Sequence, residues 1–316
     1  MTNTLRLALP QLAPIWLSRD DGLAQVIRVI ETASAENADL IVFSESFVPG
    51  YPFWLEGTGG ANFNNDKQKA IFAHYSHQAV TIEDGHLDAV CAALKTANMA
   101  CYLGVIERPR NRTGHSLYCS YVYIDKTSTV RSIHRKLQPT YEERLVWSPG
   151  DGHGLVTHRL GAFTVGGLNC WENWMPLTRA ALYGQGEDLH VMGWPGSDRN
   201  TRDLTPVLAK EGRSYCVSVS AIMRPSDVRD DTPFADDIRA SLSEMPANGG
   251  SCVAAPDGSW VLEPLIGETG IRYCELDPAF VRRERQNFDP AGHYSRPDVT
   301  QLTVDRRRQT TTVFKD

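Results

Sequence analysis

Apolar residues in the N-terminal half of the chain follow two periods that alternate along the sequence. Leucines at every second position over residues 5–9 are typical of a strand. Residues 23–30 place apolar side chains at i, i+3, i+4 and i+7 behind the polar segment 18–21, which predicts an amphipathic helix. The continuous apolar run 40–43 predicts a buried strand, and the helix-then-strand order returns over residues 87–106. This repetition favours an α/β fold.

The C-terminal half adds strands that a turn joins without a helix. Further strands are predicted at residues 189–192, 215–221 and 251–255. Residues 256–259 contain the Asp-Gly pair of tight turns, so the last of these strands is expected to form a hairpin with residues 260–262. Hairpins beside helix-linked strands predict mixed sheets.

Two polar segments and one terminal segment complete this organisation. Residues 57–69 are rich in Gly and Asn, and residues 226–250 are rich in Asp. We interpret both as surface loops of the kind that can cover a site. No linker rich in Pro, Ser or Gly divides the chain, so we expect one domain over residues 1–286 and a C-terminal tail over residues 287–316.

Composition and charge narrow the class of protein. The 316 residues are 41% hydrophobic and 22% charged, as in ordinary globular proteins. A net charge of -6 without a concentrated basic face argues against a nucleic-acid partner, and we interpret the basic run Arg306–Arg308 as a solvated tail. The chain has no apolar run long enough to span a membrane, and its start lacks the pattern of a signal peptide. We therefore expect a cytoplasmic protein without a membrane partner.

The cysteines and histidines indicate neither a disulfide framework nor a metal site. Seven cysteines without CxxC pairs suggest reduced thiols. His74 and His77 lack an HExxH context, so we assign them to a surface helix and predict no metal. Positions within predicted helices and strands assign most of the thiols to the core, namely Cys91, Cys101, Cys119, Cys216 and Cys274.

Cys170 differs from these thiols because it ends an apolar run. Residues 163–168 have strand character, and Cys170 and Trp171 follow soon after. A thiol at the carboxyl end of a buried strand is held rigidly beside backbone N–H groups that can receive negative charge, as a nucleophile requires. The alternative is an inert core thiol, since free cysteine is commonly buried.

Two further reactive side chains follow predicted strands. Glu45 comes soon after the run 40–43, where partial desolvation would raise its pKa toward that of a general base, although an exposed loop acid is the alternative. Lys136 closes the run 130–136 and would otherwise be a solvated charge. Together with Cys170 they could supply a base, a cation that stabilises an anionic intermediate, and a nucleophile.

Three sequence motifs surround these residues in a specific order. They are Phe43-Ser44-Glu45, then His134-Arg135-Lys136-Leu137 with Pro139-Thr140, and then Asn169-Cys170-Trp171-Glu172-Asn173 with Pro176. With residues 292–298 near the end, they resemble the nitrilase superfamily of carbon–nitrogen hydrolases over nearly the whole chain. The Cys-Trp-Glu-Asn form, residues 49–52 and Glu143-Arg144 resemble the true nitrilase branch. Two features depart from its pattern: Ser44, where proline is common, and a short tail.

The resemblance implies a fold and a set of site residues. The fold is an α/β four-layer α-β-β-α sandwich with two mixed β-sheets and a site between the sheets at their strand ends. The family's catalytic glutamate, lysine and cysteine correspond to Glu45, Lys136 and Cys170. Its second active-site glutamate corresponds to Glu143, which we expect to orient the lysine or the substrate. The alternative for Glu143 is a surface acid paired with Arg144 or Arg135.

The implied activity is hydrolysis of a small-molecule nitrile to the carboxylic acid and ammonia. It would proceed through a thioimidate and a thioester on the cysteine, without a cofactor, and the backbone N–H of Trp171 would bind developing charge. Tyr51, Trp54 and Trp194 are expected to line the substrate pocket, with sheet-edge packing as the alternative. The resemblance also implies a homodimer or higher homo-oligomer, with the tail packing on a neighbouring subunit.

Three other functions remain open from the sequence. An amidase or carbamoyl hydrolase of the same superfamily would prefer amides to nitriles. A thiol redox protein would consume peroxide, although Cys170 has no resolving cysteine nearby in sequence. A catalytically silent binding module is disfavoured by the intact set of Glu45, Lys136 and Cys170.

Overall fold

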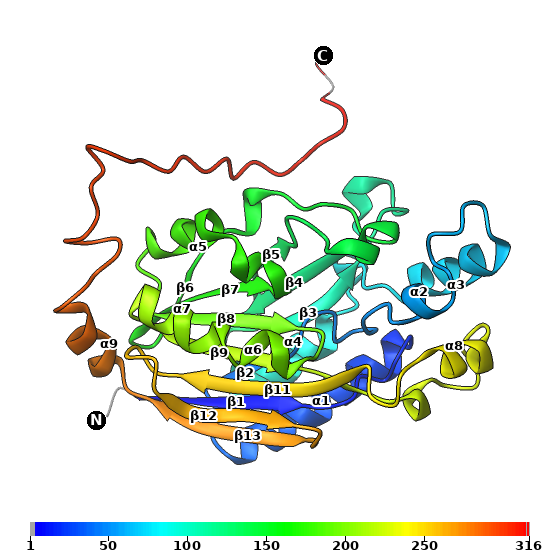
Figure 1. Ribbon diagram of the computed structural model, residues 1–316, viewed down its shortest axis with the longest axis horizontal. Helices are drawn as coiled ribbons and strands as arrows, with labels where there is room; N and C mark the ends of the chain where they lie inside the picture. Colours follow the sequence, from blue (N-terminus) through cyan, green and yellow to red (C-terminus); the bar gives the residue numbers. More distant parts are fainter. Residues whose placement is uncertain (1–3, 314, 316) are drawn as a thin grey trace.

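Two β-sheets form the centre of the molecule in the computed structural model, which describes residues 4–313 and 315 (Figure 1). The first sheet has the strand order β13-β1-β2-β3-β4-β5. Its strands are β1 (Leu5–Gln11), β2 (Leu40–Val42), β3 (Ala100–Glu107), β4 (Tyr118–Ile124), β5 (Val130–Arg135) and β13 (Gly270–Leu276). The second sheet has the order β10-β11-β9-β8-β7-β6, with β12 paired to β11. Its strands are β6 (His158–Leu160), β7 (Phe163–Asn169), β8 (Leu189–Trp194), β9 (Tyr215–Ser220), β10 (Ile222–Met223), β11 (Ala247–Ala254) and β12 (Trp260–Ile266).

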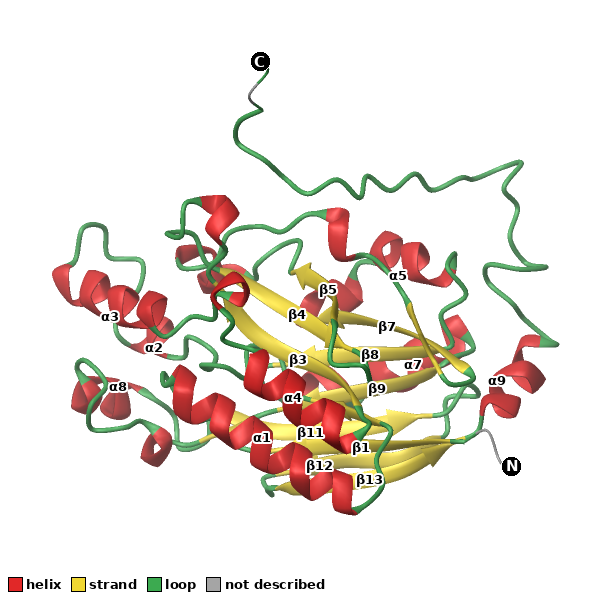
Figure 2. Ribbon diagram, turned by 180° about the vertical axis from the view of Figure 1, so that it is seen from behind, coloured by secondary structure: helices red, strands yellow, loops and turns green. Residues whose placement is uncertain are grey.

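Helices cover the outer face of each sheet, which gives the four layers that the family resemblance implies. Figure 2 shows α1 and α4 on one outer face, and Figure 1 shows α5 and α7 on the other. The helices are α1 (Arg19–Ala35), α2 (Trp54–Gly57), α3 (Asp66–His77), α4 (Asp88–Ala97), α5 (Pro176–Tyr183), α6 (Asp198–Thr201), α7 (Leu204–Gly212), α8 (Ala235–Ser241) and α9 (Pro278–Arg285). The predicted fold class is confirmed.

Apolar side chains that alternate between the two faces of a strand fill two of the interfaces between layers. Leu7 and Leu9 of β1 face the second sheet, where they join a buried cluster with Val191 and Val217. Ala8, between those leucines, belongs to the cluster under α1 and α4. Successive side chains of a strand point to opposite faces, so one short apolar run serves both the intersheet core and a helix layer.

Both sheets are mixed, as the sequence predicts. Strands β1, β2 and β3 are parallel, and so are β7, β8 and β9, whereas β4, β5, β6, β11 and β13 pair antiparallel with their neighbours. The carboxyl ends of the parallel strands therefore lie together at one end of each sheet. The predicted hairpin is confirmed: β11 and β12 are antiparallel, and Gly258 in their turn has a φ of 82°.

The segments 57–69 and 226–250, predicted as loops, contain short helices and the start of a strand. The first turn of α3 lies in the former segment, and α8 and the first residues of β11 lie in the latter. Local polar contacts favour both helices: the Asn65 side chain accepts from the Gln68 N–H at 3.1 Å, and Lys67 pairs with Asp237 at 2.6 Å. Neither helix shows a strong apolar period, so the sequence pattern missed them. Helices α2, α3 and α8 gather at one end of the molecule (Figures 1 and 2).

The tail after α9 crosses the surface of its own subunit and passes α5 (Figure 1). The Arg308 guanidinium donates to Asp151 at 2.9 Å and to the Ile133 carbonyl at 3.0 Å, and its side chain is 20% exposed. The prediction of a solvated basic run is therefore wrong for Arg308, because a buried carboxylate from a distant loop binds it. None of the helices in the described part of the chain has the length and apolar character of a membrane span.

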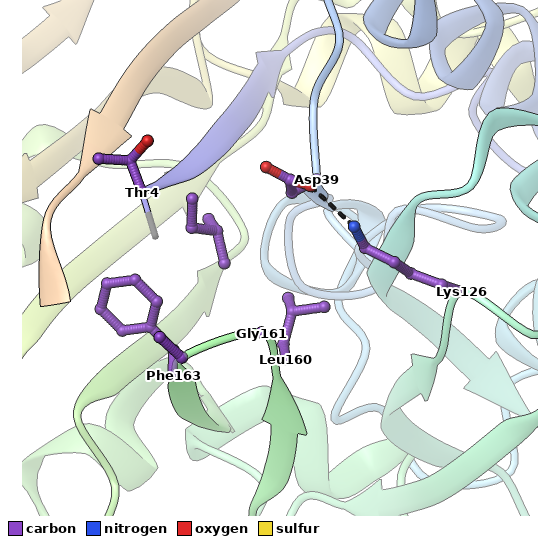
Figure 3. A pocket seen from close by; sticks show the side chains of 8 residues that line it. Thr4, Asp39, Lys126, Leu160, Gly161 and Phe163 are labelled. Atoms are coloured by element: carbon purple, nitrogen blue, oxygen red, sulfur yellow. Dashed lines mark hydrogen bonds and ion pairs between the residues drawn. The ribbon is translucent and has the colours of Figure 1, made fainter. Parts of the chain in front are cut away.

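A cavity of about 340 Å³ lies at the amino ends of β1, β2 and β7 (Figure 3). Lys126 and Asp39 form an ion pair of 2.7 Å at its edge, and Phe163 and Leu160 line the opposite side. Because the parallel strands run away from this cavity, the side chains that follow their carboxyl ends lie at the other end of the sandwich.

Candidate active site

Three strand ends bring Glu45, Lys136 and Cys170 together. Glu45 follows β2 after two residues, Lys136 directly follows β5, and Cys170 directly follows β7. Strands β2 and β5 belong to the first sheet and β7 to the second, so the three side chains converge from both sheets. All three are buried, with at most 3% of each residue exposed. The alternatives of an exposed loop acid and a solvated lysine are thus excluded.

The Lys136 ammonium lies between two carboxylates. Its Nζ donates to Glu45 Oε1 and to Glu143 Oε2, each at 2.7 Å. One oxygen of each carboxylate and the Cys170 sulfur all lie within 4.8 Å of one another. These three groups could ligate a cation, but the ammonium already supplies a positive charge between the two acids. The arrangement is therefore a compact cluster of two acids, one cation and one thiol.

Glu143 is fixed by three donors. Besides Lys136, the Thr140 backbone N–H donates to its Oε2 at 2.7 Å, and the Tyr51 hydroxyl donates to its Oε1 at 2.9 Å. Arg135 binds Glu107 instead, at 2.7 Å, so the surface ion pair considered for Glu143 does not form with that residue. Arg144 instead donates to the Pro139 carbonyl at 3.0 Å. The position of Glu143 fits the expected role of orienting Lys136.

Burial and charge shift the pKa values of the cluster. Burial raises the pKa of Glu45 to about 7, against the opposing effect of the Lys136 ammonium. Burial also raises the pKa of Cys170 well above its usual value, while Lys136 acts to lower it. Burial would lower the pKa of Lys136, but the charges of Cys170, Glu45 and Glu143 outweigh it and raise that pKa well above its usual value. The lysine stays a cation, and Glu45 can exchange a proton near neutral pH.

The backbone at Cys170 has an unusual conformation that neighbouring groups hold in place. Cys170 has a φ of 47°, in the left-handed region that non-glycine residues seldom adopt. Glu172 accepts from the Asn169 N–H at 2.9 Å and from the Leu137 N–H at 2.7 Å. It also contacts His134 Nε2 at 3.0 Å. Glu172 thereby ties the turn that carries Cys170 to the strand end that carries Lys136.

The four predicted substrate-binding residues, Tyr51, Trp54, Trp171 and Trp194, lie in different surroundings. Tyr51 lines a cavity of about 620 Å³ together with Phe53, Pro195 and Leu242. Trp194 is fully buried in a cluster that includes Cys170, and its Nε1 donates to Ser218 Oγ at 3.0 Å.

Trp54 and Trp171 lie apart from that cavity. Trp54 is buried against Trp16 and Tyr75 and lines a separate, smaller cavity, so its packing is that of a core residue. Trp171 is about half exposed, whereas its backbone N–H acts to lower the pKa of the Cys170 thiol against the effect of burial.

Cys119 is a site residue that the sequence did not reveal. The sequence assigned it to the core, and it is buried, but its thiol donates to Glu45 Oε1 at 3.3 Å. Its carbonyl also accepts from the Lys136 N–H at 2.8 Å. Only the register of β4 against β5, in which Ser120 pairs with Arg135, places this thiol at the site.

Comparisons with known proteins concern the family and the fold of the chain. Residues 6–286 match the family model described as carbon-nitrogen hydrolase. An aliphatic nitrilase from Rhodococcus rhodochrous is 31% identical over 98% of this chain and 81% of that protein. An arylacetonitrilase from Aspergillus niger is 31% identical over 98% of this chain and 91% of that protein. The crystal structure of a carbon-nitrogen hydrolase from Helicobacter pylori has a TM-score of 0.70 at 16% identity, covering 93% of this chain and 96% of that one.

Proposed function

This chain belongs to the carbon-nitrogen hydrolase family, and from that premise we propose that it is a nitrilase that uses Cys170 as its nucleophile. The reaction is hydrolysis of a nitrile to a carboxylic acid and ammonia. The observation that carries the proposal is the buried cluster itself, in which Glu45 and the Lys136 ammonium lie beside a thiol at a strand end. The similar proteins named nitrilase support the choice of nitriles as substrates.

Glu45 is the proposed base. Lys136 and Cys119 both donate to Oε1, whereas Oε2 is buried without a hydrogen-bond partner among the described residues. A carboxylate oxygen left free in this way can take the proton of the Cys170 thiol, and later that of water. With a pKa raised to about 7, Glu45 can both accept and return a proton at neutral pH.

The chemistry then proceeds in two stages. The Cys170 thiolate attacks the nitrile carbon, and the nitrile nitrogen takes up a proton, which gives a thioimidate. Water activated by Glu45 adds to that carbon, and the carbon–nitrogen bond breaks to release ammonia and leave a thioester. A second water cleaves the thioester and restores the thiol. Lys136 and the Trp171 N–H stabilise the negative charge that develops on the nitrogen and then on the oxygen.

The rest of the substrate occupies the cavity of about 620 Å³. Tyr51, which lines this cavity, donates a hydrogen bond to Glu143 of the catalytic cluster. Residues 195–197, which also line the cavity, directly follow Trp194 in the sequence, and Trp194 packs in the same cluster as Cys170. Aromatic and aliphatic side chains with a few polar groups are the usual lining of a small-molecule site.

The test is ammonia release from matched pairs of nitriles and primary amides. A nitrilase releases ammonia from the nitriles with a higher kcat/KM than from the corresponding amides, and the Cys170→Ala variant, with its fold checked by circular dichroism, releases none from either. Faster turnover of the amides would assign the chain to the amidases instead. Retention of about a tenth of the wild-type rate in Cys170→Ala would reject Cys170 as the nucleophile, because losing a covalent nucleophile normally costs orders of magnitude.

A further inference from the structure

A chain of buried polar side chains lies behind the nucleophile and has no part in the steps above. It consists of Asn173, in the turn after Cys170, His190 of β8, and Glu187, just before β8. Asn173 Nδ2 donates to the Cys170 carbonyl at 2.8 Å, Asn173 Oδ1 lies 2.8 Å from His190 Nε2, and His190 Nδ1 lies 2.9 Å from Glu187 Oε1. All three side chains are at most 1% exposed.

The donors and acceptors in this hydrogen-bonded chain of Asn173, His190 and Glu187 have one consistent assignment. The Cys170 carbonyl can only accept, so the Asn173 amide must present its NH₂ to it and its oxygen to His190. His190 Nε2 must therefore carry a hydrogen. The remaining ring nitrogen and the Glu187 carboxyl then share a second proton, because two acceptors would otherwise face each other at 2.9 Å. Glu187 thereby fixes which nitrogen of His190 is the donor to Asn173.

The Cys170 carbonyl matters because of the peptide to which it belongs. A peptide unit is planar, and in the trans form its C=O and N–H point in opposite directions. The N–H of the same unit is that of Trp171, the residue directly after the nucleophile, and this N–H acts to lower the pKa of the Cys170 thiol. Fixing the carbonyl on Asn173 therefore fixes the direction of the N–H on the reactive side. Since Cys170 has a φ of 47°, this peptide needs such external support.

We propose that Glu187, His190 and Asn173 are positioning residues that hold the Cys170–Trp171 peptide with its N–H on the reactive side, directed at the substrate atom that becomes negative. This inference rests on the proposed nitrilase activity for its kinetic consequence. Its structural consequence, the reactivity of the Cys170 thiol, does not depend on the nature of the substrate.

Glu187→Ala and Glu187→Gln form a matched pair for the test. The glutamine amide can donate to His190 Nδ1, so a neutral imidazole keeps its hydrogen on Nε2 and the chain stays intact without the charge. Alanine leaves Nδ1 without a partner, so the imidazole ring is no longer held from behind and its hydrogen bond to Asn173 weakens. Asn173→Asp breaks the chain directly, because a carboxylate oxygen would then face the Cys170 carbonyl.

Two measurements report on each variant. The first is the rate at which iodoacetamide alkylates Cys170, followed by mass spectrometry of the peptide that contains it. The second is kcat and KM for a nitrile that the wild type hydrolyses. Glu187→Ala and Asn173→Asp should slow alkylation and lower kcat by about tenfold or more, with a smaller change in KM, since a preorganised backbone donor is worth on the order of 100-fold or more. Glu187→Gln should stay within about threefold of the wild type in both, since it keeps every hydrogen bond of the chain.

The outcomes separate the two proposals. Folded Asn173→Asp protein with wild-type alkylation and wild-type kcat would overturn the inference, as would a Glu187→Gln variant as impaired as Glu187→Ala. If the wild type hydrolyses no nitrile, the proposed function fails, while the alkylation rates still decide the inference.

Should the variants not fold, nitrogen NMR of the wild type labelled at histidine decides the inference. A His190 ring with a hydrogen on Nε2 supports the proposed hydrogen bonds, and one with a hydrogen on Nδ1 alone overturns the inference.

Discussion

At the scale of single residues, the site depends on an unequal sharing of hydrogen bonds at Glu45. One oxygen receives two donors, Lys136 and Cys119, and the other receives none from the described residues. Burial raises the pKa of this carboxyl, and both donors oppose the rise because they stabilise the ionised form. The balance of these effects places its proton exchange near neutral pH.

This balance predicts the pH dependence of the reaction. Glu45 must be ionised to act as a base, so kcat/KM should rise with pH through about 7, the raised pKa of Glu45. Cys119→Ala removes one donor and should move this rise to higher pH, with roughly several-fold lower kcat/KM near pH 6 and little change near pH 8.5. Cys119→Ser keeps a donor and serves as the control. A Cys119→Ala profile that coincides with the wild type would show that the thiol does not tune Glu45.

Lys136→Arg should be nearly as inactive as Lys136→Ala. The ammonium fits between two carboxylate oxygens at 2.7 Å each and is fully enclosed. A planar guanidinium is wider and loses its proton far less readily, so we expect kcat to fall by about 100-fold or more. Lys126→Arg, in the ion pair with Asp39 at the far end of the sandwich, should change kcat little. Wild-type turnover in Lys136→Arg would limit the role of this lysine to its charge.

At the scale of elements, the tail contributes to the position of β5 and its lysine. Gln309 Nε2 donates to the Gly150 carbonyl at 3.0 Å, and the Gly150 N–H donates to the Lys136 carbonyl at 2.7 Å. Arg308 binds Asp151 beside them and the carbonyl of Ile133 in β5. The C-terminal segment thus supports the catalytic strand end within its own subunit. Packing of the tail on a neighbouring subunit, and the domain boundary at residue 286, stay predictions.

Adjacent arginines offer a direct test of this support. Arg308→Ala leaves the buried Asp151 carboxylate without its cation, and we expect a loss of roughly 1–3 kcal/mol in the free energy of unfolding, with a Tm lower by about 2–5 °C and a reduced kcat. Arg307, which is 88% exposed and whose side chain binds Asp305 alone among the described residues, provides the control. Differential scanning calorimetry and turnover measurements should show no effect of Arg307→Ala. Equal, small effects of both changes would show that the tail does not support the site.

At the scale of the whole molecule, an exposed apolar patch begins directly beside the nucleophile. It comprises Trp171, Trp174, Met175 and Leu177, which are between 37% and 67% exposed. Clustered exposed aromatic and aliphatic side chains on a globular protein often mark an interaction surface, and a symmetric homodimer would bury this patch against a second copy. The patch supports the homo-oligomer expected from the sequence, which stays a prediction.

Leu177→Glu should dissociate such a dimer, because a carboxylate would be buried against an apolar surface at a cost of several kcal/mol. Analytical ultracentrifugation at micromolar concentration should show a dimer or larger assembly for the wild type and a smaller species for the variant, with reduced activity. Phe63→Glu, at a residue that is 99% exposed in the segment before α3, is the control. A wild type that sediments as a monomer would reject the prediction.

The sequence by itself determined the alternation of helices and strands, the strand-end positions of Glu45, Lys136 and Cys170, and, through its motifs, the family and its fold. Apolar period and motif order are local properties of a chain, so they are readable without coordinates. The start of α1 after Ser18 and the hairpin of β11 with β12 follow from the same kind of signal.

The tertiary structure alone decided which side chains support those residues. Cys119 reaches Glu45 only through the register of β4, and His190 reaches the Cys170 turn only because β8 lies beside β7. The same holds for Arg308, which meets Asp151 from a position 157 residues away. Long-range hydrogen bonds between buried polar groups depend on strand order and register, and a one-residue shift in register would turn each of these strand side chains to the opposite face.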